Sequence, residues 1–360
     1  MQLLDTFSSQ LRDSFDDITQ NVQVDYAKLA VNHKNYKPLE IPSEVTKRFQ
    51  NTSEKIKEKY FSSQVRNFLY GIYYNGSLKN VLKLSSNSSI EQPQQIIENN
   101  TFLGVDLKFY EQLHTNNCGN GYFDPGWTIC KQKSETELAV VKNGLTLHVE
   151  RQNHLRPIEQ FASVNDSIAI RMPKNLVQNG FYMAVGDSGA NSLKETVRIY
   201  FNLTPEGAVA VMNSLTRKLN EMNISFSFKV LYDPSVYDRY DSGVLYFDRS
   251  NYDSVRKIVT EVYVETQSCF QAEIPLFTKL LAPGLAVAEE PNLKFVSQES
   301  FGMNRCQIVA NGLLEAYHSK NNSPPKKMNS IIQQFSLLGI DWQHPYLNSN
   351  SEDIYTPLNI

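Results

Sequence analysis

The sequence has 360 residues, of which 41% are hydrophobic and 20% charged, and this composition excludes the disordered, collagen-like and low-complexity classes. At roughly 100–200 residues per domain, the length predicts two domains or one large elaborated domain. The 35 Lys and Arg residues against 38 Asp and Glu give a net charge of −3. No global positive charge recruits nucleic acid or an anionic membrane, so any anion site must be local.

The N-terminal segment and the cysteines predict a cytoplasmic protein without metal or cofactor. Residues 1–19 hold charged side chains and no apolar run that resembles a signal peptide. No window approaches the ~18 consecutive apolar residues of a membrane-spanning helix. The four cysteines lie far apart and favour reduced thiols over a disulfide framework. His and Cys do not show the paired spacing that is typical of metal sites.

The first 80 residues predict helices. Apolar residues recur at spacings of three and four from Leu3 to Ile18, and a less regular helical pattern runs from Pro42 to Tyr74, with Pro42 and Ser43 as start signals. Residues 83–100 are rich in Ser, Asn and Gln and predict a surface connection. We therefore expect a helical N-terminal region over 1–95.

The middle of the chain predicts strands, in an α+β fold with a mixed sheet of about six strands. The strand-like segments are 145–150, 167–171, 181–186, 197–203, 226–232 and 243–247. Thr204 and Pro205 open a helical pattern between two of them, so residues 197–232 predict a β-α-β unit with parallel strands and the helix on one face of the sheet. Helices are expected again at 300–318 and 327–338. The expected domain covers 101–348, followed by a tail at 349–360.

Alternation along the two strands of this β-α-β unit places polar side chains on one face. Arg198, Tyr200 and Asn202 share the face opposite the helix, and Lys229 of the partner strand points to the same side. From the residues alone, a solvated cationic sheet face explains this pattern better than a binding site does.

Three further residues extend this face. Arg305 lies in the apolar stripe of the helix expected at 300–318 and needs either a bound anion or a structural carboxylate partner. Arg239 lies in a turn-rich segment, and Tyr246 lies in the following strand. By themselves, Arg239 is more typical of a loop charge and Tyr246 of a core tyrosine than of a site. Cys306 fits a buried structural cysteine better than a nucleophile.

Several sequence motifs resemble the HopA-type effector family. They are VRIYFNLTPEGA (197–208), FSFKVLYDPSVYDRYDSGVLYF (226–247), PLFTKLLAPGLAVAEEP (275–291), ESFGMNRCQIVANGLLEAY (299–317) and HPYLN (344–348). The resemblance covers roughly residues 100–348. The family was named from type III secreted proteins of plant pathogens and recurs in class V lanthipeptide gene clusters, where its members look like the lyase partner of a separate kinase. It is distantly similar to phosphothreonine lyases that inactivate host MAP kinases.

The resemblance implies roles for six residues of this chain. Lys229 falls on the catalytic lysine and Tyr200 on the general acid, where the lyases carry His. Phosphate-binding positions fall on Arg198, Arg239, Tyr246 and Arg305, with Asn202 beside them. Tyr in place of His keeps a proton donor but raises its unperturbed pKa from ~6.5 to ~10. Lys229 would have to be neutral to remove a Cα proton, while the arginines hold the phosphate.

Three functions are compatible with this pattern. The first is a cofactor-free phospho-Ser/Thr lyase that converts a phosphorylated precursor peptide to dehydroamino acids, with separate kinase and cyclase partners. The second is a module that binds phosphopeptides without chemistry. The third is a structural or toxin-like module whose polar sheet face meets a partner chain. Lys229→Arg separates the first two, because a binder tolerates it and a base does not.

Overall fold

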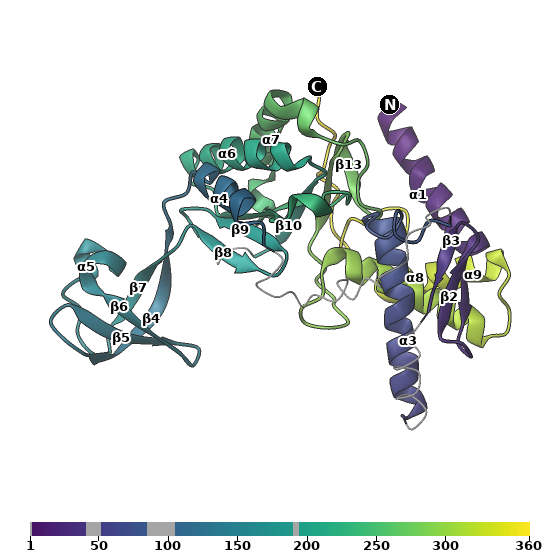
Figure 1. Ribbon diagram of the computed structural model, residues 1–360, viewed down its shortest axis with the longest axis horizontal. Coiled ribbons are helices and arrows are strands. Elements are labelled where there is room, and N and C mark those ends of the chain that lie inside the picture. The colour runs from purple at the N-terminus through teal and green to yellow at the C-terminus, as the bar shows by residue number, and fades with distance from the viewer. Residues whose placement is uncertain (1, 41–51, 85–104, 190–193) are drawn as a thin grey trace.

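The computed structural model describes residues 2–40, 52–84, 105–189 and 194–360 and has an α+β fold (Figure 1). A seven-stranded sheet lies at the centre, a small four-stranded lobe lies at one end, and helices from both ends of the chain pack together at the other. The α+β class predicted from the sequence is confirmed. None of the helices in the described ranges combines the length and apolar character that a bilayer crossing requires.

Helices form where apolar residues recur at helical spacing. Their bounds are α1 Gln2–Asn21, α3 Glu54–Leu69, α4 Leu107–Asn116, α5 Arg151–His154, α6 Pro205–Glu221, α7 Tyr252–Thr266, α8 Phe301–His318 and α9 Pro324–Leu337. The helices expected near both ends of the chain are confirmed by α1, α3, α8 and α9. The start signals Pro42 and Ser43 lie outside the described residues, as do residues 85–100 of the expected connection.

The N-terminal region contains a small sheet that the sequence analysis did not predict. Its strands are β1 Gln23–Asp25, β2 Ala30–His33 and β3 Tyr36–Leu39, and they pair antiparallel. Strands of three or four residues are too short to show a reliable alternation. Directly after α3, the helix widens into a π-helical turn, η1 Tyr70–Tyr74.

The central sheet has the order β13-β14-β10-β12-β11-β9-β8. Its strands are β8 Asn175–Gln178, β9 Phe181–Val185, β10 Thr196–Phe201, β11 Phe226–Leu231, β12 Gly243–Asp248, β13 Lys279–Ala282 and β14 Leu285–Glu289. Every neighbouring pair is antiparallel, whereas a mixed sheet was expected. β10 and β11 do run parallel with α6 between them, but β12 lies between the two strands and pairs antiparallel with both.

Two of the predicted strands belong to a different sheet. Segments 145–150 and 167–171 lie in the small lobe, whose order is β6-β5-β4-β7, with β4 Tyr122–Gln132, β5 Glu137–Lys142, β6 Leu145–Glu150 and β7 Ser167–Met172. The lobe has its own apolar core around Trp127 and Leu138. Alternation reveals a strand but not its partner, which explains why the two sheets were predicted as one.

Helix α6 covers one face of the central sheet, with α7 beside it (Figure 1). The helix begins as predicted, because the Thr204 side chain accepts a hydrogen bond from the Gly207 amide and Pro205 occupies the first helical position. Val197, Ile199 and Phe201 of β10 are fully buried. The opposite face therefore presents the alternating residues of the same strands.

Candidate functional site

The strand register gathers the predicted polar residues on the face away from α6. Arg198 of β10 lies directly opposite Tyr246 of β12. Val244, two residues earlier in β12, lies opposite Tyr200 on one side and Lys229 of β11 on the other. Directly opposed residues in an antiparallel sheet point to the same face. Arg198, Tyr200, Lys229 and Tyr246 therefore share one face across three adjacent strands.

The Tyr246 ring lies between the two cations of this face. The Arg198 guanidinium carbon lies 4.9 Å from the ring centroid, and the Lys229 ammonium lies 5.6 Å from it. Lys229 also lies 4.3 Å from the centroid of Phe181 in β9. Lys229 is half-buried, and within the described residues it forms no salt bridge. Lys229 is thus a partly accessible amine beside aromatic faces, and its charge helps to lower the pKa of the buried Asp241.

Arg198 is already paired with an acidic residue. Its guanidinium contacts the carboxylate of Glu290, the residue that follows β14. The other oxygen of Glu290 accepts a hydrogen bond of 2.5 Å from Lys294. Burial acts to lower the pKa of Arg198, but Tyr246, Tyr200 and Glu290 raise it overall. The guanidinium is therefore firmly cationic, and an incoming anion has to share it with Glu290 or displace that carboxylate.

Arg239 is paired in the same way. Its Nε and one terminal nitrogen donate to the two oxygens of Asp241 at 2.6 and 2.9 Å. Asp241 is buried, which by itself raises its pKa, but the guanidinium more than offsets this and lowers the pKa overall. The Arg239 guanidinium lies 5.7 Å from the centroid of Phe181, the ring that also contacts Lys229. The turn-rich segment thus brings Arg239 to the edge of the Lys229 cluster.

Tyr200 is almost inaccessible, with 1% of its surface exposed. Its ring packs edge-on against Tyr74, with ring centroids 6.4 Å apart, and lies tilted against Phe301 of α8, with centroids 6.2 Å apart. Burial raises the pKa of Tyr200 well above its ordinary value, although Arg198 acts in the opposite direction. The phenol keeps its proton and lies below the accessible surface of the cluster.

Arg305 lies on the same side of the sheet as Tyr200, since both contact Phe301. The sequence analysis assigned this guanidinium to phosphate binding, but in the structure its hydrogen bonds go to backbone carbonyls. Nε donates to the carbonyl of Pro345 at 2.7 Å, and a terminal nitrogen donates to that of Leu347 at 3.0 Å. Burial lowers the pKa of Arg305 to about 10. The side chain holds the closing HPYLN segment in place and is fully buried.

Asn202 is also engaged with the backbone. It follows β10, is buried, and donates from its side-chain amide to the carbonyl of Glu273 at 3.0 Å. Within the described residues, its hydrogen bonds do not lead to Lys229 or the arginines. Of the seven predicted site residues, Lys229, Tyr246 and Arg239 are thus the partly accessible ones, and Asn202 and Arg305 support the surrounding loops.

The sequence analysis missed four members of the cluster. Tyr70 and Tyr74 come from the π-helical turn η1, where Tyr70 donates to Asp241 at 3.3 Å and the two rings stack at 4.9 Å. Asp241 and Glu290 are the carboxylates that pair with the arginines. π-helical turns are frequent at functional sites, but the tyrosine-rich YGIYY sequence lies in a region predicted as a separate helical unit.

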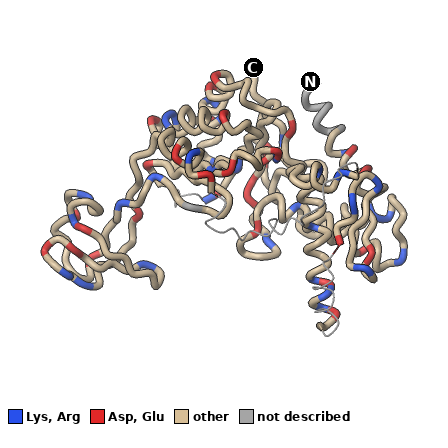
Figure 2. Tube along the Cα trace, in the orientation of Figure 1, with Lys and Arg blue, Asp and Glu red and all other residues tan. Residues whose placement is uncertain are grey.

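Acidic and basic residues are interspersed along the chain rather than gathered on one element (Figure 2). Within the described residues, no group of three or more His, Cys, Asp or Glu side chains is placed to hold a metal ion. Cys306 is fully buried, and burial raises the pKa of its thiol.

The family model matched by this chain agrees with the motifs. Two solved structures of effector proteins align with this chain, from Pseudomonas syringae pv. tomato strain DC3000 at 18% sequence identity and from pv. syringae strain 61 at 14%. Each alignment covers 68% of this chain and 81% of the effector, with a TM-score of 0.42. A search of curated proteins finds no match. Residues 172–347 match the model of the HopA1 effector protein family, so the resemblance is confirmed over a segment that contains β8 to α9.

Proposed function

We propose that this protein is a phospho-Ser/Thr lyase that eliminates phosphate from a phosphorylated precursor peptide without a cofactor. The observation that carries the proposal is the shared sheet face. Lys229, which is half-buried and forms no salt bridge within the described chain, lies on the same side as Arg198, Tyr200 and Tyr246. A nitrogen base beside anion-binding guanidinium groups is what β-elimination of phosphate requires.

The proposed reaction breaks two substrate bonds, Cα–H and Cβ–O, and involves two proton transfers. The neutral Lys229 amine accepts the Cα proton of phosphoserine or phosphothreonine. The electron pair of the broken C–H bond forms the Cα=Cβ double bond, and the Cβ–O bond breaks so that phosphate leaves with its electrons. The products are dehydroalanine or dehydrobutyrine, inorganic phosphate and protonated Lys229. Tyr200 would protonate the departing phosphate as the substrate closes over it, and the resulting phenolate would regain its proton from protonated Lys229 through solvent, which restores both groups.

Arginine pairing suggests how the phosphate would enter. Arg198 would exchange Glu290 for the phosphate, and Lys294 would keep Glu290 in place because it already holds the other carboxylate oxygen. A dianionic phosphate competes better for a guanidinium than a monoanionic carboxylate does. The Arg198–Glu290 pair would therefore favour phosphorylated ligands over ligands that carry only a carboxylate. Arg239 and Tyr246 would donate further hydrogen bonds to the phosphate from the accessible side of the cluster.

The second candidate is a phosphopeptide-binding, effector-like module without catalysis. Its supporting observation is Tyr200, whose hydroxyl is buried and whose raised pKa suits proton donation less than a histidine would. The lanthipeptide context, with a kinase that supplies the phosphopeptide and a cyclase that consumes the dehydrated product, rests on the motif resemblance and is part of the proposal. A cytoplasmic location fits the same context.

Incubation with phosphoserine and phosphothreonine peptides in metal-free buffer tests the proposal. Mass spectrometry should show loss of phosphoric acid from the peptide, and thiol addition should trap the dehydroamino acid. The unphosphorylated peptide is the matched control. Saturable binding of the phosphopeptide with no product would establish the binding module instead, and absence of both binding and product would exclude both candidates.

A further inference from the structure

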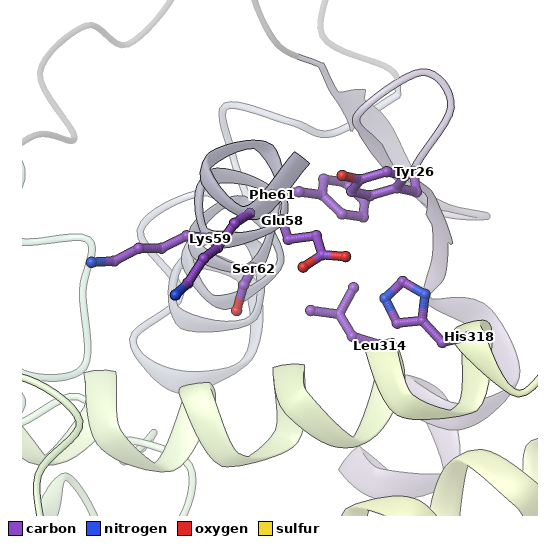
Figure 3. Close-up of a pocket in the computed structure, with 8 residues that line it drawn as sticks. Tyr26, Glu58, Lys59, Phe61, Ser62, Leu314 and His318 are labelled. Carbon is purple, nitrogen blue, oxygen red and sulfur yellow. The ribbon is translucent and has the colours of Figure 1, made fainter. Parts of the chain in front are cut away.

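A cavity of about 460 Å³ lies between the first half of α3 and the end of α8 (Figure 3). Tyr26, which follows β1, and Phe61 of α3 form one wall, while Leu314 and His318 of α8 form the other. From Glu58, α3 continues for eleven residues to Leu69, about 16 Å at 1.5 Å per residue, before the turn that carries Tyr70 and Tyr74 begins. The cavity is therefore separate from the cation cluster.

Three aromatic rings surround this cavity. The rings of Tyr26 and Phe61 meet edge-on with centroids 5.6 Å apart, and those of Tyr26 and His318 do so at 6.2 Å. Phe61 is fully buried and forms an apolar floor, whereas His318 is exposed at the rim. The negative face of an aromatic ring attracts cations, and a planar guanidinium gains further stacking contact.

A carboxylate projects between the rings. Figure 3 shows the Glu58 side chain between Tyr26 and Phe61 on one side and Leu314 and His318 on the other. Across the described residues, Glu58 forms no salt bridge. Glu54 lies close by and accepts a hydrogen bond from the Tyr26 hydroxyl at 3.1 Å. Desolvation and the charges of Glu54 and Glu58 raise the pKa of Tyr26 to about 12, in keeping with a negative environment.

The lysines at the cavity do not neutralise this environment by pairing with Glu58. Lys55 and Lys59 are exposed, and Figure 3 shows Lys59 extending away from the aromatic rings. Lys57 pairs with Glu54 at 2.7 Å and leaves Glu58 to a ligand. The last turn of α8 ends at His318, and the negative end of a helix dipole also favours a cation.

We propose that this cavity binds an arginine side chain presented by a peptide. The guanidinium would stack against Tyr26 and His318 and donate two hydrogen bonds to Glu58, while its aliphatic stem would lie on Phe61 and Leu314. The volume exceeds that of one guanidinium and leaves room for the neighbouring peptide backbone. This inference is independent of the proposed lyase activity.

The test is an NMR titration of the full chain that follows the His318 imidazole signals, assigned with His318→Gln. The probe is N-acetyl-arginine amide, and the uncharged N-acetyl-citrulline amide has the same shape. The arginine probe should shift the His318 signals saturably, and citrulline should bind at least about fivefold more weakly. Glu58→Gln should weaken arginine binding by a similar factor, whereas Glu221→Gln, an exposed glutamate on α6, should leave it unchanged.

Equal affinity for citrulline, or unchanged arginine binding in Glu58→Gln, would overturn the proposal. Inorganic phosphate is the opposing probe, because Lys55, Lys59 and His318 also border the cavity. Saturable phosphate binding at His318 in place of arginine binding would identify an anion site and contradict the inference. Because Glu58 is exposed, its replacement by Gln leaves the packing of α3 intact.

Discussion

The two faces of the central sheet are built by alternate residues of the same strands, yet they are stabilised differently. On the α6 side, Val197, Phe228 and Phe247 are fully buried in an apolar core. On the other side, Arg198 and Arg239 are each neutralised by a carboxylate, and Lys229 remains half-buried among aromatic rings. One face contributes stability through burial of apolar surface, and the other keeps charged groups at fixed positions where they are able to bind or react.

The largest expected effect is a difference in stability between substitutions at two adjacent residues, Phe228 and Lys229, which lie on opposite faces of the sheet. Phe228→Ala should lower the free energy of unfolding by about 3–5 kcal/mol, because a fully buried aromatic ring leaves a cavity. Lys229→Met, at the next position on the opposite face, should change it by less than about 1 kcal/mol. Urea unfolding of both variants measures the difference. Similar losses in the two variants would contradict the division of roles.

The second prediction concerns the buried phenol on the polar face. Tyr200→Phe keeps the ring that packs against Tyr74 and Phe301 but removes the proton donor. Elimination should slow by roughly 10- to 100-fold while phosphopeptide affinity stays the same. Rate measurements at saturating peptide, with binding measured separately, test this. Unchanged rates would remove Tyr200 from the mechanism.

The third prediction concerns the Arg198 guanidinium, which pairs with Glu290. Glu290→Gln removes the carboxylate that pairs with Arg198 and should strengthen phosphopeptide binding by about fivefold, or about 1 kcal/mol. Glu261→Gln is the matched control, because Glu261 pairs with Lys218 on the helices of the other face. Weaker binding in Glu290→Gln would show that Glu290 positions Arg198 rather than competing with the phosphate.

The smallest effect concerns Asp248, at the end of β12. Hydrogen bonds from Ser250 and from the backbone amides of Lys194 and Glu195 outweigh desolvation and lower its pKa to about 2. Since this pKa lies below the unfolded value of 3.8, the carboxylate stabilises the fold above about pH 4, and this contribution is lost as pH falls toward 2. In Asp248→Asn, the free energy of unfolding should fall less between about pH 4 and pH 2 than it does in the wild type, as measured by urea unfolding at each pH. An unchanged acid profile in the variant would contradict it.

Local patterns predicted much of this molecule. Apolar spacing located α1 and α8, and Thr204 with Pro205 marked the start of α6. Alternation also assigned Arg198, Tyr200 and Lys229 to one face, because a strand's period of two fixes the side of every residue once one side is buried. These features depend on residues that are close together in the sequence.

The features that escaped prediction depend on distant partners. β12 separates β10 from β11, and the small lobe takes two strands that look like members of the central sheet. Tyr74 reaches Tyr200 across more than a hundred residues, and Glu290 reaches Arg198 from beyond β14. Arg305 was expected to bind an anion, but the carbonyls of Pro345 and Leu347 accept its hydrogen bonds. Sequence periodicity reports only on neighbouring residues, so it does not predict these contacts between distant segments.

Elimination by Lys229→Arg at saturating phosphopeptide tests the central claim most directly. Arginine keeps the positive charge that would bind phosphate but does not act as a base at neutral pH. We expect binding within a few-fold of the wild type, and elimination reduced by about 10²–10⁴-fold. Wild-type elimination rates in Lys229→Arg would contradict the assignment of Lys229 as the base.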